Sequence, residues 1–69
     1  MFIIYTLHAE EQLHERNILK LWIEETIKWP DQIKRQGDKY LVRRKLNGRS
    51  IEVVYIKEKY IKIITTYWI

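Results

Sequence analysis

A histidine and an arginine on one predicted helix are of the residue types needed to cleave RNA without a metal. Such cleavage needs a base for the 2′-hydroxyl, an acid for the leaving oxygen and a cation for the phosphorane. Histidine serves as acid or base near neutral pH, and arginine binds phosphate through two parallel hydrogen bonds. His8, Gln12 and Arg16 are spaced four residues apart and therefore form one stripe along a helix. The alternative is structural: His8 packs or caps, and Arg16 pairs with an acid of its own helix.

A dense basic cluster in the second half of the chain points to phosphate binding. Its side chains would attract the RNA backbone, and two neighbouring tyrosines would stack on bases. The alternative is that the charges keep an exposed strand from pairing with other strands. The basic residues are Arg43, Arg44, Lys45 and Arg49, and the tyrosines are Tyr40 and Tyr55.

Arg44 is the most informative member of this cluster because it falls on the apolar face of its predicted strand. A charge among apolar neighbours must be paired or must line a cleft. We therefore group Arg44 with His8 and Arg16 as candidate catalytic residues, in which the arginines bind phosphate and the histidine transfers protons. A helix carboxylate that pairs with Arg44 is the competing explanation.

The charge of the chain is divided between its two parts. Residues 1–33 carry three basic and six acidic groups, 3 − 6 = −3, whereas residues 34–69 carry ten basic and three acidic groups, 10 − 3 = +7. A basic surface raises the local concentration of polyanions. The second part therefore indicates a nucleic-acid partner, which we expect to be RNA.

The composition excludes several classes of protein and site. With 69 residues and no cysteine, the chain predicts a single domain, residues 1–69, without disulfides or thiolate zinc sites. It has no Gly-rich phosphate loop and no metal-ligand cluster, so we expect neither cofactor nor metal. No apolar run reaches the roughly 20 residues of a membrane span, and no signal peptide is recognisable. We expect a cytoplasmic protein that does not contact the membrane.

Two helices are predicted in the first part of the chain. A short strand at 2–5 precedes a helix at 7–16, which Thr6 caps and Asn17 ends in the left-handed conformation. A second helix carries a stripe of apolar residues and ends before Pro30. The short connection between the helices indicates a helical hairpin.

Beyond the second helix the period changes from 3.6 to 2, which predicts strands. Asn47-Gly48 is a type I′ turn signal, and a two-residue loop there pairs Leu46 with Arg49. The same register makes Arg43 and Glu52 a cross-strand ion pair. The more apolar face of this hairpin is expected to meet the helices.

A last strand at 60–68 follows a turn whose length the sequence leaves open, so its register is open as well. Together the elements predict an α+β fold. In it, an N-terminal short strand and a helical hairpin pack on an antiparallel β-meander of three to four strands.

A set of short motifs runs along the chain in a fixed order: Tyr5-Thr6-x-His8-Ala9, Arg16-x-Ile18, a helix ending at Pro30, Val42-Arg43-Arg44, Val53-Val54-Tyr55 and Ile64-Thr65-Thr66-Tyr67. Their order and spacing resemble a family of small prokaryotic proteins of unassigned function. That family is grouped with the BrnT-like branch of the RelE/ParE toxin superfamily. The resemblance covers nearly the whole chain.

This resemblance implies a RelE/BrnT-like fold and a toxin-like activity, because the superfamily contains ribonucleases and gyrase poisons that an antitoxin often neutralises. The chain departs from the family at Gln12, where an arginine is usual, and at Asn17, where a glycine is usual. Losing the arginine removes a phosphate-binding charge. The leading interpretation is an RNA-binding, metal-independent endoribonuclease of a toxin–antitoxin system, with a cognate antitoxin as partner. A non-catalytic nucleic-acid-binding module and a protein-interaction domain, such as a homodimer, stay open as alternatives.

Overall fold

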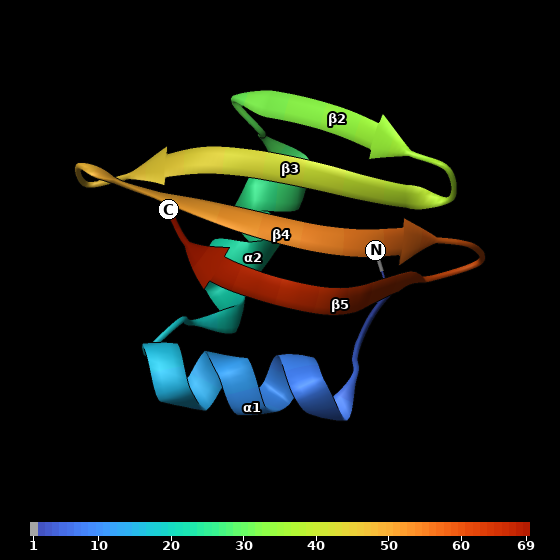
Figure 1. Ribbon diagram of the computed structural model, residues 1–69, viewed down its shortest axis with the longest axis horizontal. Helices are drawn as coiled ribbons and strands as arrows, with labels where there is room; N and C mark the ends of the chain where they lie inside the picture. Colours follow the sequence, from blue (N-terminus) through green and yellow to red (C-terminus); the bar gives the residue numbers. More distant parts are fainter. Residues whose placement is uncertain (1) are drawn as a thin grey trace.

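The computed structural model describes residues 2–69, which form an α+β domain of two short helices and one five-stranded sheet (Figure 1). Across the sheet the strands follow the order β1-β5-β4-β3-β2. The elements are β1 (Ile3–Tyr5), α1 (Leu7–Arg16), α2 (Lys20–Lys28), β2 (Gln32–Gln36), β3 (Lys39–Leu46), β4 (Arg49–Lys57) and β5 (Ile61–Trp68). Within the described residues, no helix is long and apolar enough to cross a membrane.

The predicted α+β class and helical hairpin are confirmed, and β2 to β5 form the antiparallel meander at its predicted upper limit of four strands; the predicted short N-terminal strand joins the same sheet and makes it mixed. β1 pairs in parallel with β5, from Ile3 opposite Ile61 to Tyr5 opposite Ile63. β2 adds a complete antiparallel outer strand to β3. Because β1 and β5 lie at opposite ends of the sequence, no turn signals their pairing. β2 is exposed along its whole length, so no alternation of apolar and polar residues marks it.

The two ends of α1 form as predicted. The hydroxyl of Thr6 accepts a hydrogen bond from the backbone N–H of Ala9 at 3.0 Å and so caps the first turn. Asn17 ends the helix in the left-handed conformation, with φ 53° and ψ 50°. The backbone N–H of Ile18 then donates to the carbonyl of Leu13, and both side chains enter the core. These signals set the angle at which α1 approaches the sheet.

α1 completes the edge of β5 where β1 stops. The amide oxygen of Gln12 accepts hydrogen bonds from the backbone N–H of Thr66 at 3.0 Å and from the hydroxyl of Thr65 at 2.6 Å. The guanidinium of Arg16 donates to the carbonyl of Thr66 at 2.8 Å, and the indole N–H of Trp68 donates to the carbonyl of Arg16. Side chains of a helix thus replace a missing strand and protect an edge that would otherwise be free to pair.

The β3–β4 hairpin forms as predicted. Asn47-Gly48 has φ values of 47° and 86°, as a type I′ turn requires. The register pairs Leu46 with Arg49 and Arg43 with Glu52. The more apolar face of the hairpin lies in the core, which is the face predicted to meet the helices.

A β-bulge divides β5 into two halves with opposite alternation. Ile63 pairs with Tyr55 and Thr65 pairs with Val54, which leaves Ile64 as the extra residue. Odd-numbered residues therefore face the core before the bulge, and even-numbered residues face it afterwards. A single alternation cannot describe this strand, which is why its register could not be read from the sequence.

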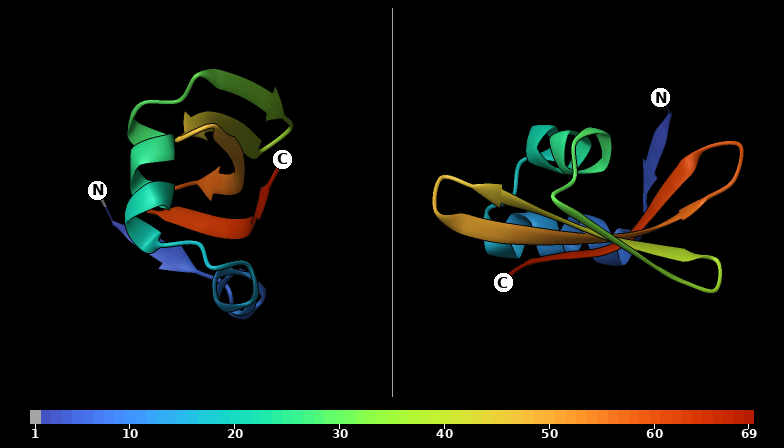
Figure 2. Two further views of the ribbon diagram at one scale, coloured as in Figure 1. Left: turned by 90° about the vertical axis from the view of Figure 1, so that its left-hand side faces the viewer. Right: turned by 90° about the horizontal axis from the view of Figure 1, so that it is seen from above.

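The helices lie on one side of the sheet and at its edge (Figure 2). α2 covers one face of the sheet, which we call the covered face, and buries its own residues Ile23 and Thr26 against that face. Pro30 follows the end of this helix. Among residues 2–69 no helix lies on the opposite face, which we call the uncovered face. Side chains alternate along β3, so Arg43 belongs to the uncovered face and Arg44 to the covered face.

Candidate functional site

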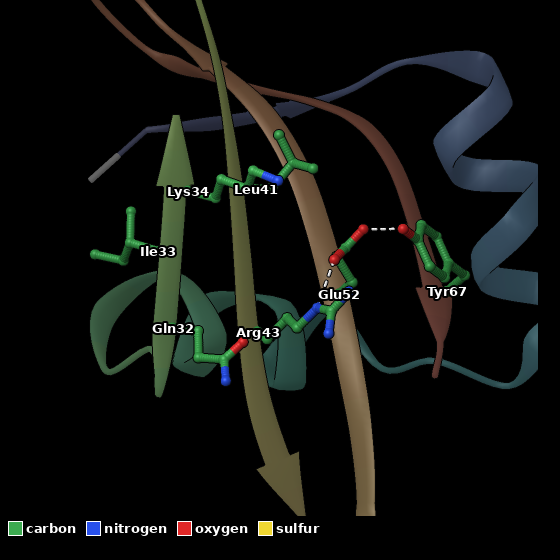
Figure 3. A pocket seen from close by; sticks show the side chains of 7 residues that line it. All are labelled: Gln32, Ile33, Lys34, Leu41, Arg43, Glu52 and Tyr67. Atoms are coloured by element: carbon green, nitrogen blue, oxygen red, sulfur yellow. Dashed lines mark hydrogen bonds and ion pairs between the residues drawn. The ribbon is translucent and has the colours of Figure 1, made fainter. Parts of the chain in front are cut away.

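On the uncovered face, a buried carboxylate is held between a guanidinium and a phenol (Figure 3). Glu52 is only 3% exposed, and Nε of Arg43 donates a hydrogen bond to its Oε1 at 2.7 Å, which is also an ion pair. The hydroxyl of Tyr67 donates to Oε2 of the same carboxylate. Both carboxylate oxygens therefore have a partner, which offsets the cost of removing the charge from water. We call these three residues the Glu52 network.

The three residues of the Glu52 network belong to one row of four side chains that crosses neighbouring strands. Gln32 lies opposite Arg43, Arg43 opposite Glu52, and Glu52 opposite Tyr67. Directly opposite residues of a sheet are close enough for their side chains to touch. Tyr67 belongs to this row because the bulge at Ile64 shifts the alternation of the last residues of β5.

The Glu52 network borders a cleft of about 720 Å³ on the uncovered face. Gln32, Lys34 and Leu41 line the same cleft, and Figure 3 shows Lys34 extending from β2 across β3. Lys34 and Arg43 oppose the single acid Glu52, so the formal charge of the lining is 2 − 1 = +1. This arrangement can hold an anion beside a proton acceptor.

A second cleft, of about 560 Å³, lies on the covered face between the end of α1, α2 and the β3–β4 hairpin. We call it the arginine cleft. It brings together most of the basic residues that the sequence singled out, although they come from α1, β3 and β4. Its charged and aromatic lining consists of Arg16, Arg44, Lys45, Arg49, Glu25, Trp22 and Trp68.

Arg44 lines the arginine cleft, as expected for a charge on an apolar face that must either be paired or line a cleft. Within residues 2–69 its hydrogen-bond partner is a backbone carbonyl, whereas the competing explanation named a helix carboxylate. Nη1 of Arg44 donates to the carbonyl of Trp29 at 2.6 Å, and Trp29 is the residue that ends α2. A cation is favourable there because the helix dipole is negative at its C-terminal end. Nε of Arg44 is buried without a hydrogen-bond acceptor in residues 2–69.

Arg49 and Arg16 reach the arginine cleft by different routes. The guanidinium of Arg49 lies over the ring of Trp68, 4.2 Å from its centroid. Trp68 in turn meets Trp22 edge-on, with ring centroids 5.7 Å apart. Arg16 is tied to β5 by the hydrogen bond to Thr66 that closes the sheet edge. Its role is therefore structural as well as electrostatic.

The structure does not assemble His8, Arg16 and Arg44 into one site. His8 is exposed in the first turn of α1, eight residues before Arg16, which places it about 12 Å away along the helix axis. In the described part of the chain, the lining of the arginine cleft includes Arg16 and Arg44 but not His8. A histidine acting on a phosphate held by these two arginines lacks the required proximity.

The two tyrosines predicted as stacking platforms stack on each other instead. Tyr40 and Tyr55 have ring centroids 5.2 Å apart and an interplanar angle of 10°. Tyr55 is only 7% exposed and belongs to the core of the covered face. Burial, and to a lesser degree the neighbouring Tyr40, raises the pKa of the Tyr55 phenol. Neither ring lies on the face of Arg43, so neither complements a phosphate bound by that residue.

Sequence reasoning gave Glu52 only the role of an ion-pair partner and noted Tyr67 only as a tyrosine of the segment Ile64-Thr65-Thr66-Tyr67 that could assist phosphate chemistry, outside the candidate catalytic residues. One signal for Glu52 was present, because it is the only acid within an otherwise apolar stretch of β4. An acid in such a strand must be paired or must serve a function. Tyr67 had no comparable signal because the bulge, which is not apparent in the sequence, decides which face it occupies.

Comparison with known proteins places the domain in a family. Residues 5–68 match the family model of DUF4258, a domain of unknown function. The chain belongs to this family. The match includes the Glu52 network and the arginine cleft, so both lie within the DUF4258 domain. No curated protein and no solved structure was found to match the chain. Among residues 2–69, no group of three or more His, Cys, Asp or Glu side chains is placed to hold a metal ion.

Proposed function

We propose that this DUF4258 domain binds RNA on its uncovered face and cleaves it as a metal-independent endoribonuclease. The observation that carries the proposal is the buried Glu52 carboxylate, held by Arg43 and Tyr67 at the border of a cleft that also contains Lys34. A proton acceptor, a phenol and two cations in one cleft supply the groups that phosphodiester cleavage needs.

Arg43 would bind the scissile phosphate. Its Nε is engaged with Glu52, which fixes the plane of the guanidinium and leaves both Nη groups to donate to phosphate oxygens. About half of this side chain is exposed (49%), so a phosphate can approach it from solvent. The same contact would stabilise the additional negative charge of the phosphorane.

Tyr67 and Glu52 would act together on the 2′-hydroxyl. Glu52 is too deeply buried to touch substrate, whereas Tyr67 is only partly buried and donates its hydrogen bond to Glu52. As the 2′-oxygen attacks phosphorus, its proton passes to the Tyr67 oxygen, and the Tyr67 proton passes to Glu52. Glu52 is then the positioning residue and final proton acceptor, and Tyr67 is the catalytic residue.

Lys34 would protonate the leaving 5′-oxygen when its bond to phosphorus breaks. The products are a 2′,3′-cyclic phosphate and a 5′-hydroxyl end. Glu52 then loses its proton to water and Lys34 regains one, which restores the starting state without a metal or cofactor.

The RelE/BrnT-like resemblance supports this proposal because that superfamily contains ribonucleases. On the same resemblance we propose that a cognate antitoxin neutralises the activity in the cytoplasm. Induced expression with and without the product of the neighbouring gene tests this part. We expect cells that express the domain alone to grow slowly and cells that also express the neighbouring product to grow normally. Equal growth with and without the neighbouring product would count against an antitoxin.

The decisive test of the enzymatic activity is cleavage of a labelled RNA oligonucleotide in the presence of EDTA. We expect cleavage by the natural protein, and a loss of about 100-fold or more for Tyr67→Phe and for Glu52→Gln. Tyr40→Phe is the matched control on the covered face and should retain activity. A substrate with a 2′-deoxyribose at the cut site should stay intact. Absence of cleavage by the natural protein, or full activity of Tyr67→Phe, would overturn the proposal.

Binding without cleavage is the second candidate, and the deep burial of Glu52 favours it, because a sequestered acid also serves a purely structural purpose. In that case the uncovered face would still bind RNA phosphate. Lys34→Gln should lower the slope of log affinity against log salt by about one, whereas Lys59→Gln in the β4–β5 turn should not. RNA that is bound in this way but never cut would select this candidate.

A further inference from the structure

We propose that the arginine cleft is a separate nucleotide site, which binds a terminal phosphate through its arginines and a base against its tryptophans. The cleft lies on the covered face, whereas the Glu52 network lies on the uncovered face. The inference therefore does not depend on the proposed ribonuclease activity. Its ligand chemistry is a phosphomonoester attached to a nucleoside, either as a free nucleotide or as the 5′ end of an RNA strand.

The charge of the arginine cleft favours an anion. Arg16, Arg44 and Arg49 line it together with Glu25, which gives a formal charge of 3 − 1 = +2; Lys45 also borders the cleft, although its side chain alternates to the other face of β3. The ion pairs within residues 2–69 are Lys20–Glu10 and Arg43–Glu52, and neither uses a cation of this cleft. Cations gathered in a cleft without ion-pair partners raise the local concentration of anions.

Arg44 gives the strongest reason for a bound anion. A guanidinium carries five N–H donors, and the one hydrogen bond that Arg44 forms within residues 2–69 goes to the carbonyl of Trp29. Its Nε is buried and has no acceptor in the described part of the chain. A half-buried cation with unused donors is costly, and phosphate oxygens are the acceptors that best fit a guanidinium fork. A phosphate in this cleft would accept from the Nη donors of Arg44, which are not among the buried atoms that lack an acceptor in residues 2–69.

The aromatic wall favours a nucleotide over a bare phosphate. Trp22 and Trp68 meet edge-to-face, and Arg49 lies over the ring of Trp68. Because Arg49 covers the ring of Trp68, a base would stack on the outer plane of this guanidinium, as bases do on arginine in many RNA sites, or on Trp22. A volume of about 560 Å³ is within the range of about 300 to 1,000 Å³ typical of small-molecule sites. The cleft thus has room for a nucleoside as well as its phosphate.

Binding of AMP, GMP and inorganic phosphate, measured by calorimetry, tests the site. We expect both nucleotides to bind more tightly than phosphate, and Arg49→Gln to weaken them about tenfold. Arg35→Gln is the matched control, because Arg35 also stacks on an aromatic ring, that of Tyr40 at 5.2 Å, but lies on the outer strand. Arg44→Lys, which keeps the charge but loses the fork, should weaken binding as well. Circular dichroism verifies that each variant is folded.

Two 2′-O-methyl trinucleotides, which cannot be cleaved through a 2′-hydroxyl, separate the two sources of the ligand. Tighter, Arg49-dependent binding of the 5′-phosphorylated form than of the 5′-hydroxyl form identifies an RNA end as the ligand. Nucleotide binding without that difference identifies a free nucleotide, and either result supports the site. The proposal is overturned if neither nucleotide binds or if phosphate binds as tightly as AMP. It is also overturned if Arg35→Gln weakens nucleotide binding as much as Arg49→Gln does. Tighter binding of an oligoglutamate peptide than of the nucleotides would overturn it as well.

Discussion

The Glu52 network and the arginine cleft lie on opposite faces of one sheet and differ in how their charged groups are paired. On the uncovered face the acid is buried and both of its oxygens are hydrogen-bonded, with a net lining charge of 2 − 1 = +1. On the covered face the cations Arg16, Arg44 and Arg49 outnumber Glu25, with a net charge of 3 − 1 = +2, and Arg44 retains donors without an acceptor in residues 2–69. A satisfied network holds groups in fixed geometry, whereas an unsatisfied cleft attracts a ligand. The proposed chemistry and the proposed nucleotide binding therefore belong to opposite faces.

The two regions share β5, and disrupting that strand should damage both. Gln12→Ala removes the acceptor for the backbone N–H of Thr66 and the hydroxyl of Thr65. We expect a loss of about 3 kcal/mol in the free energy of unfolding, because a buried donor is left unpaired and a cavity forms. Urea denaturation measures it. Gln12→Glu keeps an acceptor and should cost clearly less; equal losses would show that the hydrogen bonds at this edge contribute little.

Replacing either of the two neighbouring arginines of β3 by methionine should lower the free energy of unfolding, but by different amounts. Arg43→Met leaves the buried Glu52 without its ion-pair partner, and we expect a loss of about 2 kcal/mol, limited because Arg43 is half exposed. Arg44→Met removes a half-buried cation that has no counter-ion among residues 2–69, so the loss of stability should stay under about 1 kcal/mol. Denaturation of both variants under one set of conditions gives the comparison. A larger loss for Arg44→Met would contradict the contrast between the two faces.

Alkaline pH should affect stability through the phenols on the helix side of the sheet. Burial, followed by the charges of Glu24 and Glu10, raises the pKa of Tyr5 to about 12, and burial raises that of Tyr55. Because the neutral phenol is favoured in the folded state, this stabilisation is complete below the ordinary pKa of 10.0 and is lost as the pH rises towards 12. Tyr5→Phe should therefore lose less stability between pH 9 and 11 than the natural protein, as thermal unfolding will show. A parallel decline in both proteins would argue against this assignment.

Local signals predicted the parts of the fold that depend on neighbouring residues. Thr6, Asn17 and the Asn47-Gly48 turn each determine a conformation within a few residues, and each forms as expected. The pairing of β1 with β5, the bulge at Ile64 and the contacts of Gln12 with β5 join distant segments. No periodicity in the sequence records such contacts.

The candidate site was predicted in part, for the same reason. The alternation of β3 correctly separated Arg44 from Arg43 and placed Arg44 toward the helices. The predicted grouping with His8 did not form, because helical spacing alone cannot say which stretch of α1 faces a cleft. The position of Tyr67 beside Glu52 depends on the bulge, so alternation in the sequence could not reveal it.

The central claim, that chemistry belongs to the uncovered face and nucleotide binding to the covered face, is tested most directly by RNA cleavage in EDTA with two variants. The account predicts that Tyr67→Phe loses cleavage about 100-fold or more, while Arg49→Gln, a change in the arginine cleft, keeps it within a few-fold. Cleavage that survives in Tyr67→Phe but is lost in Arg49→Gln would contradict the account and move the chemistry to the arginine cleft.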